Sequence, residues 1–225
     1  MRPHGERLAR VLLVLFGAAV VADLASLVAG YHPGHIVAKP LLMPLLALQA
    51  RVRGGPRPLI AALLFGWGGD VLLLSHADAA FLVGMASFAA GHVCYLVLFG
   101  RHGAPRARGA WLAAAYAMAL VTTVTLLWPD LPAGLRIPVA GYSLLLTAMA
   151  FGATRLGPLV GAGGALFMLS DTLIATGVAD WPQLPRPDFW IMLTYCVAQF
   201  LLVRGTLDER RAPTAAYGEV RSTTS

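Results

Sequence analysis

The sequence is a succession of long apolar segments separated by short connections rich in proline and glycine. A membrane-spanning helix needs about 20 predominantly apolar residues. Charged residues make up only 12% of the 225 residues, whereas a soluble domain carries roughly 25%, so a water-soluble core cannot account for this chain. We therefore predict an all-α, polytopic integral membrane protein with eight transmembrane helices, at residues 8–30, 35–51, 58–75, 78–99, 109–128, 134–153, 157–177 and 187–204.

The positions of the arginines support this number of spans. If each predicted helix crosses the membrane once, fourteen of the sixteen arginines fall on the side of the two termini, and only Arg136 and Arg186 fall on the other. Cytoplasmic loops are enriched in Lys and Arg, so both termini are predicted to be cytoplasmic. The net charge of +6 is therefore an orientation signal. Nucleic acid is not a predicted partner, because no basic stretch has interleaved aromatic residues.

The predicted membrane domain covers residues 1–205, and residues 206–225 are predicted to form a polar, disordered cytoplasmic tail. Residues 1–25 also resemble a signal peptide, but the apolar segment continues to Ala29, which favours a retained first helix. Cys94 and Cys196 lie in apolar segments and predict small buried side chains, not a disulfide framework. Sparse lysine with abundant Ala, Arg and Gly indicates a GC-rich bacterial genome, and hence the bacterial cytoplasmic membrane.

Charged side chains inside the predicted spans are rare, and such residues usually serve a function. They are Asp23, Asp70, Asp171 and Lys39, the only lysine of the chain. At about 1.5 Å per residue, the three aspartates lie roughly 18 to 22 Å from the cytoplasmic ends of their helices. Lys39 enters from the opposite side and lies roughly 6 Å deep. We therefore expect all four groups to meet in one layer, nearer the extracytoplasmic face.

Two of these aspartates lie in similar sequence. The segments "LLFGWGGDVLLL" (63–74) and "GALFMLSDTLIA" (164–175) each place an Asp after a Phe-containing apolar run. Asp70 and Asp171 would each lie in the third helix of a four-helix half, which predicts a parallel four-plus-four repeat. A single intramembrane Asp can also be a packing residue bonded to Ser or Thr. Two in matched contexts favour a functional pair, whereas Asp23 has no further cue.

Further polar groups lie in the fourth and eighth predicted helices. His92 and Tyr95 belong to the fourth, although His92 alone is equally well explained as a core histidine. Tyr195 and Gln199 are four residues apart in the eighth and share a face. Lys39 could reach the outer interface, neutralise an aspartate or hold a phosphate. No metal or other cofactor is predicted, because the outer-loop candidates have no metal-ligand spacing; they are His32, His35, His76 and Asp78.

Several of these segments resemble the YhhN-like family of membrane lysoplasmalogenases. The resemblance runs from the second to the eighth predicted helix. "GWGGD" has a small residue where a bulkier one usually precedes GD, and "TYC" replaces a double tyrosine, but neither change removes an ionisable group. The resembling segments are "AKPLLMPLL" (38–46), "LLFGWGGDVLLL" (63–74), "FLVGMASFAAGHVCYLVLF" (81–99), "GALFMLSDTLIA" (164–175) and "TYCVAQFLL" (194–202).

The resemblance implies hydrolysis of the vinyl ether bond of a lysoplasmalogen, giving a fatty aldehyde and glycerophosphoethanolamine or glycerophosphocholine. The family's paired aspartates match Asp70 and Asp171. Vinyl ether cleavage is acid-catalysed and passes through an oxocarbenium ion, so one protonated and one ionised carboxyl group suit it, as they suit glycosidases. Which aspartate is the acid stays open. The residues expected to line the site or bind the lysophospholipid are Asp23, Lys39, His92, Tyr95, Ser170, Tyr195 and Gln199.

The residues by themselves also allow two other functions. Buried carboxylates and a repeat suit a proton-coupled transporter of a small amphiphile or lipid. A non-enzymatic membrane scaffold or lipid-binding protein is the third alternative. Aldehyde release in detergent distinguishes the enzyme from a transporter, which needs a sealed membrane. The sequence indicates no oligomeric state.

Overall fold

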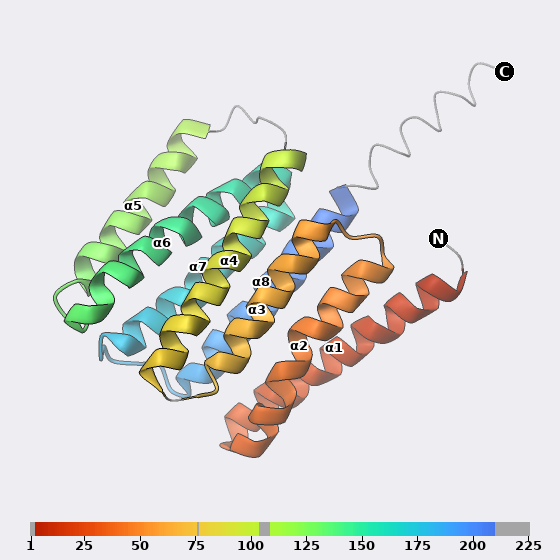
Figure 1. Ribbon diagram of the computed structural model, residues 1–225, viewed down its shortest axis with the longest axis horizontal. Coiled ribbons are helices and arrows are strands. Elements are labelled where there is room, and N and C mark those ends of the chain that lie inside the picture. The colour runs from red at the N-terminus through yellow and green to blue at the C-terminus, as the bar shows by residue number, and fades with distance from the viewer. Residues whose placement is uncertain (1–2, 76, 104–108, 210–225) are drawn as a thin grey trace.

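The chain folds into a bundle of helices that lie side by side with alternating direction (Figure 1). The computed structural model describes residues 3–75, 77–103 and 109–209. Within these ranges there is no strand. The helices are α1 (Pro3–Ala29), α2 (His32–Val52), α3 (Arg57–Leu72), α4 (Asp78–His102), α5 (Gly109–Leu127), α6 (Ala133–Ala153), α7 (Pro158–Val178) and α8 (Pro187–Glu209), with a short 3-10 turn η1 (Thr154–Leu156) after α6.

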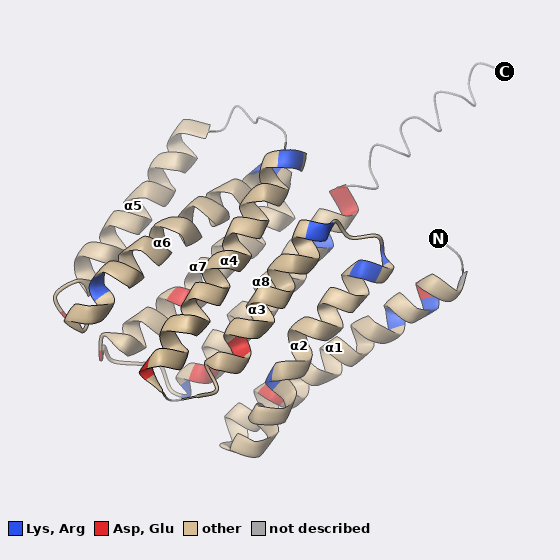
Figure 2. Ribbon diagram, in the orientation of Figure 1, with Lys and Arg blue, Asp and Glu red and all other residues tan. Residues whose placement is uncertain are grey.

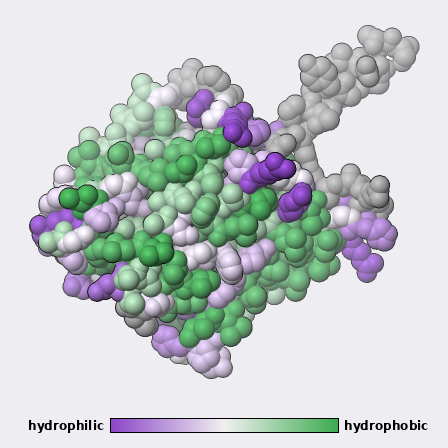
Figure 3. Space-filling view, in the orientation of Figure 1, coloured by the Kyte–Doolittle hydropathy of each residue, from purple (hydrophilic) through white to green (hydrophobic). Residues whose placement is uncertain are grey.

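The composition of these helices is that of a multi-pass membrane protein. Six of the described helices are long and apolar enough to cross a membrane; α2 and α3 are not among them. The third predicted span ends earlier than expected, because α3 stops at Leu72 and residues 73–75 form a turn. Large apolar side chains such as Val14, Met118 and Ile137 are exposed. Figure 3 shows apolar residues over much of the visible face, with the most hydrophilic ones near its ends.

Glycine and proline set the helix boundaries that the connections predicted. Pro stands in the first turn of α2, α3 and α7, where its missing N–H removes no helical hydrogen bond. Gly30 follows α1 and Gly54 follows the end of α2, with φ of 70° and 78°. Such left-handed residues close helix C-termini, and glycine adopts them without a Cβ penalty.

Lysine and arginine gather mainly at one end of the bundle, the end at which both described ends of the chain lie (Figures 1 and 2). Arg51 and Arg101 stand in the last turns of α2 and α4, and Arg155 in η1. The alternation of the arginines along the sequence thus corresponds to one basic end. That this end faces the cytoplasm remains a prediction from the positive-inside rule.

The packing of the two halves agrees with the expected repeat. In the first half α2 packs on α3 and α3 on α4; in the second, α6 packs on α7 and α7 on α8. The fourth helix of each half also packs on the second helix of the other, α4 on α6 and α8 on α2. The first helices of the halves, α1 and α5, lie at opposite edges of the bundle (Figure 1), but α5 is less buried, with one buried residue, Leu127. As a result, α3, α4, α7 and α8 lie at the centre.

The last helix extends past the predicted end of the membrane domain at residue 205. Thr206 and Leu207 are buried, and Arg204 pairs with Asp208 one turn on at 2.7 Å. These contacts continue α8 to Glu209, so residues 206–209 belong to the helix and not to a tail. The rest of the predicted tail lies outside the described residues.

Gly164 gives a direct test of the central helix packing. A Cβ at Gly164 of α7 would lie 2.9 Å from Ala150 Cα of α6, too close for the two backbones to stay in place. Gly164→Ala is therefore expected to destabilise the protein by about 1–3 kcal/mol, measured as a lower melting temperature in detergent. The control is Gly141→Ala on α6, where a Cβ meets nothing within 4 Å. Equal melting temperatures for the two variants would contradict this packing.

Candidate active site

The carboxyl group of Asp70 lies at the end of a buried chain of hydrogen bonds. Tyr195 of α8 donates its hydroxyl to Asp70 Oδ2 at 2.8 Å. Gln199 Nε2 donates to Tyr195 Oη at 3.4 Å, and Tyr95 of α4 donates to Gln199 Oε1 at 2.6 Å. All four side chains are buried. Three helices thus converge on one carboxyl group, and Tyr195 and Gln199 share a face as their spacing predicted.

The glycines of "GWGGD" explain how α8 and α4 approach Asp70 so closely. A Cβ at Gly66 would lie 3.1 Å from Tyr195 Oη, and one at Gly69 would lie 2.4 Å from the Phe88 ring. Both helical positions therefore favour a residue without a side chain, because small residues let membrane helices pack closely. The small residues before Asp70 make the space that its partners fill.

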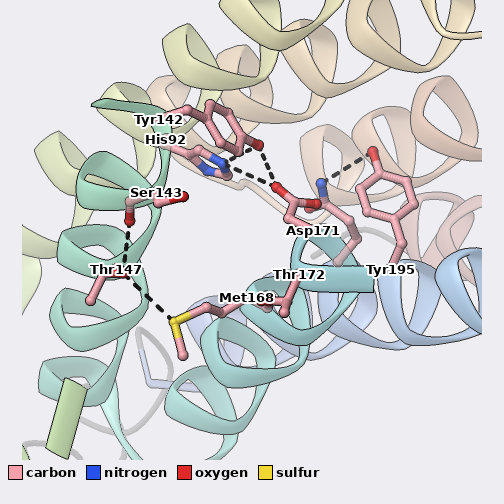
Figure 4. A network of polar contacts seen from close by, with 9 residues as sticks. His92, Tyr142, Ser143, Thr147, Met168, Asp171, Thr172 and Tyr195 are labelled. Carbon is pink, nitrogen blue, oxygen red and sulfur yellow. Dashed lines mark hydrogen bonds and ion pairs between the residues drawn. The ribbon is translucent and has the colours of Figure 1, made fainter. Parts of the chain in front are cut away.

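Asp171 has a separate set of partners, drawn from α4 and α6 (Figure 4). Tyr142 donates its hydroxyl to Asp171 Oδ2. His92 Nε2 lies 3.0 Å from Tyr142 Oη and 3.9 Å from Asp171 Oδ2. Since the Tyr142 proton points to Asp171, the network assigns the imidazole proton to His92 Nε2. His92 Nδ1, which is buried and has no partner, then carries the lone pair.

Aromatic rings lie between the two networks. The Phe167 ring centroid is 4.9 Å from that of His92 and 5.4 Å from that of Tyr195, both edge to face. Phe88 packs against the same tyrosine, with centroids 6.0 Å apart. Asp70 and Asp171 nevertheless interact electrostatically. Among the described residues the two carboxyl groups share no hydrogen-bond partner.

Asp171 borders a largely apolar cavity of about 70 Å³ between α4, α5, α6 and α7. Tyr142, Thr147 and Thr172 are among its polar lining, and Thr147 Oγ1 donates to the Ser143 carbonyl at 2.7 Å (Figure 4). Asp70 does not line this cavity. Its apolar lining is made by Leu73, Phe81, Met85, Phe88, Ala119, Leu120, Val139, Leu146, Met168, Ile174, Ala175 and Val178.

Asp23 and Lys39 lie on the other side of Asp70, away from this cavity. Asp23 is fully buried; His35 Nδ1 lies 2.8 Å from its Oδ1, and its Oδ2 has no partner. The ammonium of Lys39, which is 8% exposed, forms no hydrogen bond to the described residues. Asp23, His35 and Lys39 all interact electrostatically with Asp70. The four ionisable groups were expected in one layer. They instead form two neighbouring clusters, with Asp23, Lys39 and Asp70 in the first and Asp171 in the second.

We expected Ser170, Asp23 and Lys39 to line one site with Asp171, but none of the three lines the cavity that Asp171 borders. Ser170 Oγ donates to the Ile191 carbonyl of α8 at 3.0 Å and is buried between α7 and α8. The reason is helix geometry: successive residues are rotated by about 100°, so Ser170 points away from the cavity that Asp171 faces. Depth along a helix does not give the direction of a side chain.

Two contributors escaped the sequence analysis, namely Tyr142 and His35. The only sequence signal for Tyr142 was its place in a largely apolar stretch of α6, because a buried tyrosine hydroxyl usually has a hydrogen-bond partner. His35 was considered with the outer-loop metal candidates. Among the described residues, no group of three His, Cys, Asp or Glu side chains could hold a metal; His76 lies outside them.

Comparisons with known proteins bear on this arrangement. The model of the YhhN family matches residues 34–206, the range from α2 to α8 that holds both aspartates. The chain belongs to the YhhN family. Its relatives include a pig (Sus scrofa) protein named lysoplasmalogenase TMEM86B, 38% identical over 165 residues, which are 72% of this chain and 70% of the relative. The rat (Rattus norvegicus) protein of that name is 34% identical over 78% of this chain and 72% of its own length.

Bacterial members of the YhhN family match over a longer range. A Mycobacterium tuberculosis protein named lysoplasmalogenase is 30% identical over 94% of this chain and 89% of its own length. The match therefore takes in nearly the whole helical bundle. No solved structure matches this chain.

Removing the Tyr195 hydroxyl tests the buried network. Tyr195→Phe leaves Asp70 Oδ2 without its donor, which is expected to destabilise the protein by about 1–3 kcal/mol and to lower the melting temperature in detergent. The control is Tyr116→Phe on α5, whose ring packs on Phe151 and whose hydroxyl bonds to none of the described residues. A Tyr195→Phe variant that melts with the control would contradict the assigned hydrogen bond.

Proposed function

We propose that this protein is a lysoplasmalogenase of the bacterial cytoplasmic membrane. It hydrolyses the vinyl ether bond of lysoplasmenylethanolamine or lysoplasmenylcholine, giving a fatty aldehyde and glycerophosphoethanolamine or glycerophosphocholine. The observation that carries the proposal is a carboxyl group, Asp171, at the wall of a largely apolar cavity inside the bundle. The proposal is supported by relatives named lysoplasmalogenase in the same family.

Asp171 is the proposed general acid, because it borders the space in which an alkenyl chain would lie. Its proton passes to the outer alkene carbon, where the π electron pair forms the new C–H bond and leaves an oxocarbenium ion. The Tyr142 hydroxyl occupies Asp171 Oδ2, which leaves Oδ1 to carry the proton. His92 holds Tyr142 in place. A positioned acid of this kind typically contributes about 10²–10⁴-fold to a rate.

Asp70 is the proposed second carboxyl group and is ionised while the oxocarbenium ion forms. Its negative charge favours the oxocarbenium ion across the aromatic rings, in a region of low dielectric where charge stabilisation is strong. Water adds to the cation and loses a proton, which Asp70 accepts through the Tyr195 hydroxyl. The hemiacetal then collapses: its O–H proton moves to the glycerol oxygen as that C–O bond breaks, and the aldehyde forms.

The placement of Lys39 favours one of the three roles open to it. Its side chain is buried and its ammonium interacts electrostatically with Asp70, which suits neutralisation of a carboxylate. The cavity at Asp171 holds only roughly two water volumes at about 70 Å³. A long alkenyl chain therefore needs α5 to move aside, and α5 is the least buried of the described helices.

Asp70→Asn and Asp171→Asn test the proposed pair. Each is expected to reduce aldehyde release from lysoplasmenylethanolamine at least about 100-fold, because asparagine can neither donate nor accept the proton. The detergent-purified parent and both variants are assayed at equal folded concentration. Asp78→Asn, an exposed change at the start of α4, serves as the control and keeps full activity.

The outcomes separate the candidate functions. Full activity in either site variant would contradict a catalytic pair. No aldehyde from a folded parent, across both head groups and a range of pH, would overturn the hydrolase and make lipid or amphiphile transport the leading function.

A paired substitution on α5 tests the binding cavity. Ala119 lines the cavity, whereas Met118 is 67% exposed on the outer face of the same helix. Ala119→Trp is expected to raise KM for the lipid about tenfold, since a bulky ring fills space that the chain needs, a loss of about 1.4 kcal/mol of binding. Met118→Trp leaves KM unchanged. Equal KM values from initial rates would place the substrate elsewhere.

A further inference from the structure

A second pocket lies at the end of the bundle opposite to the chain ends. It holds about 180 Å³ between the α1–α2 turn and the start of α8. Unlike the cavity at Asp171, it is lined by polar groups, among them Ser26, His32, His35, Arg186 and Asp188. Arg186 Nη1 donates to the Leu27 carbonyl at 3.2 Å and so joins the loop before α8 to the end of α1. Such polar groups suit water and small ions.

His35 connects this pocket to the interior. Its side chain lines the pocket and is 14% exposed, while its Nδ1 lies 2.8 Å from Oδ1 of the fully buried Asp23. The other oxygen of Asp23 has no partner, although buried polar atoms are nearly always hydrogen-bonded. Lys39, the next buried polar group, also has N–H donors that bond to none of the described residues. Two groups that interact electrostatically with Asp70 thus have unused hydrogen-bonding capacity.

The polar groups around this path come from four helices. Asp23 and Lys39 both interact electrostatically with Asp70 and with Cys196, which places α1, α2, α3 and α8 around one buried cluster. Asp70 itself does not line the apolar cavity, so the proton that it accepts through Tyr195 leaves it by another direction. The ionisable or charged groups that face the path are Asp23 of α1; Tyr31, His32, His35 and Lys39 in and before α2; Asp70 of α3; and Arg186, Asp188, Tyr195 and Cys196 in and before α8.

We propose that His35 and Asp23 form a proton relay between the polar pocket and Asp70, with Lys39 balancing one of the two carboxylate charges. The inference rests on the proposed function. In each turnover Asp171 gives one proton to carbon, and the added water gives one proton to Asp70. The relay carries the second proton from Asp70 through Asp23 and His35 to water in the pocket, which becomes hydronium. A hydronium ion from bulk water gives a proton back to Asp171 and so restores the acid. The balance is one water consumed and no net proton.

Chemical rescue tests the relay. His35→Ala is expected to lower kcat for aldehyde release about tenfold or more, with KM unchanged because the lipid cavity is untouched. Added imidazole fits the pocket left by the ring and restores kcat in a concentration-dependent way. Asp23→Asn also lowers kcat, but imidazole does not restore it. His32→Ala is the matched control: it removes a histidine from the same pocket that forms no ion pair with a described carboxylate, and kcat stays at the parent value.

Each outcome decides between the relay and simpler explanations. An undiminished kcat in a folded His35→Ala variant overturns the relay. A lowered kcat that imidazole does not raise, together with a lowered melting temperature, assigns His35 a structural role and also overturns it. Equal losses in the His32 and His35 variants would point to the pocket as a whole and against the relay. A parent that releases no aldehyde overturns the proposed function itself.

Discussion

The structure depends on how an apolar bundle accommodates carboxylates. In a membrane interior a polar group without an internal partner is costly, because no bulk water is available to solvate it. Asp70 and Asp171 meet this constraint in the same way, each by accepting a tyrosine hydroxyl. The glycines before Asp70 follow from it, because they leave room beside α3 for the Tyr195 hydroxyl and the Phe88 ring.

The two halves solve this problem with different helices, and the difference separates the aspartates chemically. Tyr195 reaches Asp70 from α8, which belongs to the other half of the bundle, whereas Tyr142 reaches Asp171 from α6, which belongs to the same half. One carboxyl group borders the largely apolar cavity, and the other is buried and interacts electrostatically with Lys39 and Asp23. A near-symmetric pair of sequences thus gives two unlike environments, which is what an acid and an ionised partner require.

The sequence predicts the helices well because hydrophobic length and the position of Gly and Pro are local properties. It also predicts that Asp70, Asp171, Tyr195 and Gln199 lie inside the bundle, through their depth and spacing. It does not predict Tyr142 or His35, because each partners a residue on another helix and neither belongs to a periodic pattern. Ser170 was misplaced for the same reason: the direction of a side chain around its helix depends on packing that only the fold supplies.

The position of α5 determines from where a ligand can enter the cavity. One side of this helix walls the cavity, and its opposite side carries exposed Trp111, Met118 and Val121. The cavity is thereby separated from the surrounding acyl chains by the width of one helix. Any ligand that enters past α5 is drawn from the bilayer, so its relevant concentration is a mole fraction among lipids. Ordinary phospholipids then act as competitors, and occupancy follows the composition of the membrane more than the amount of lipid in water.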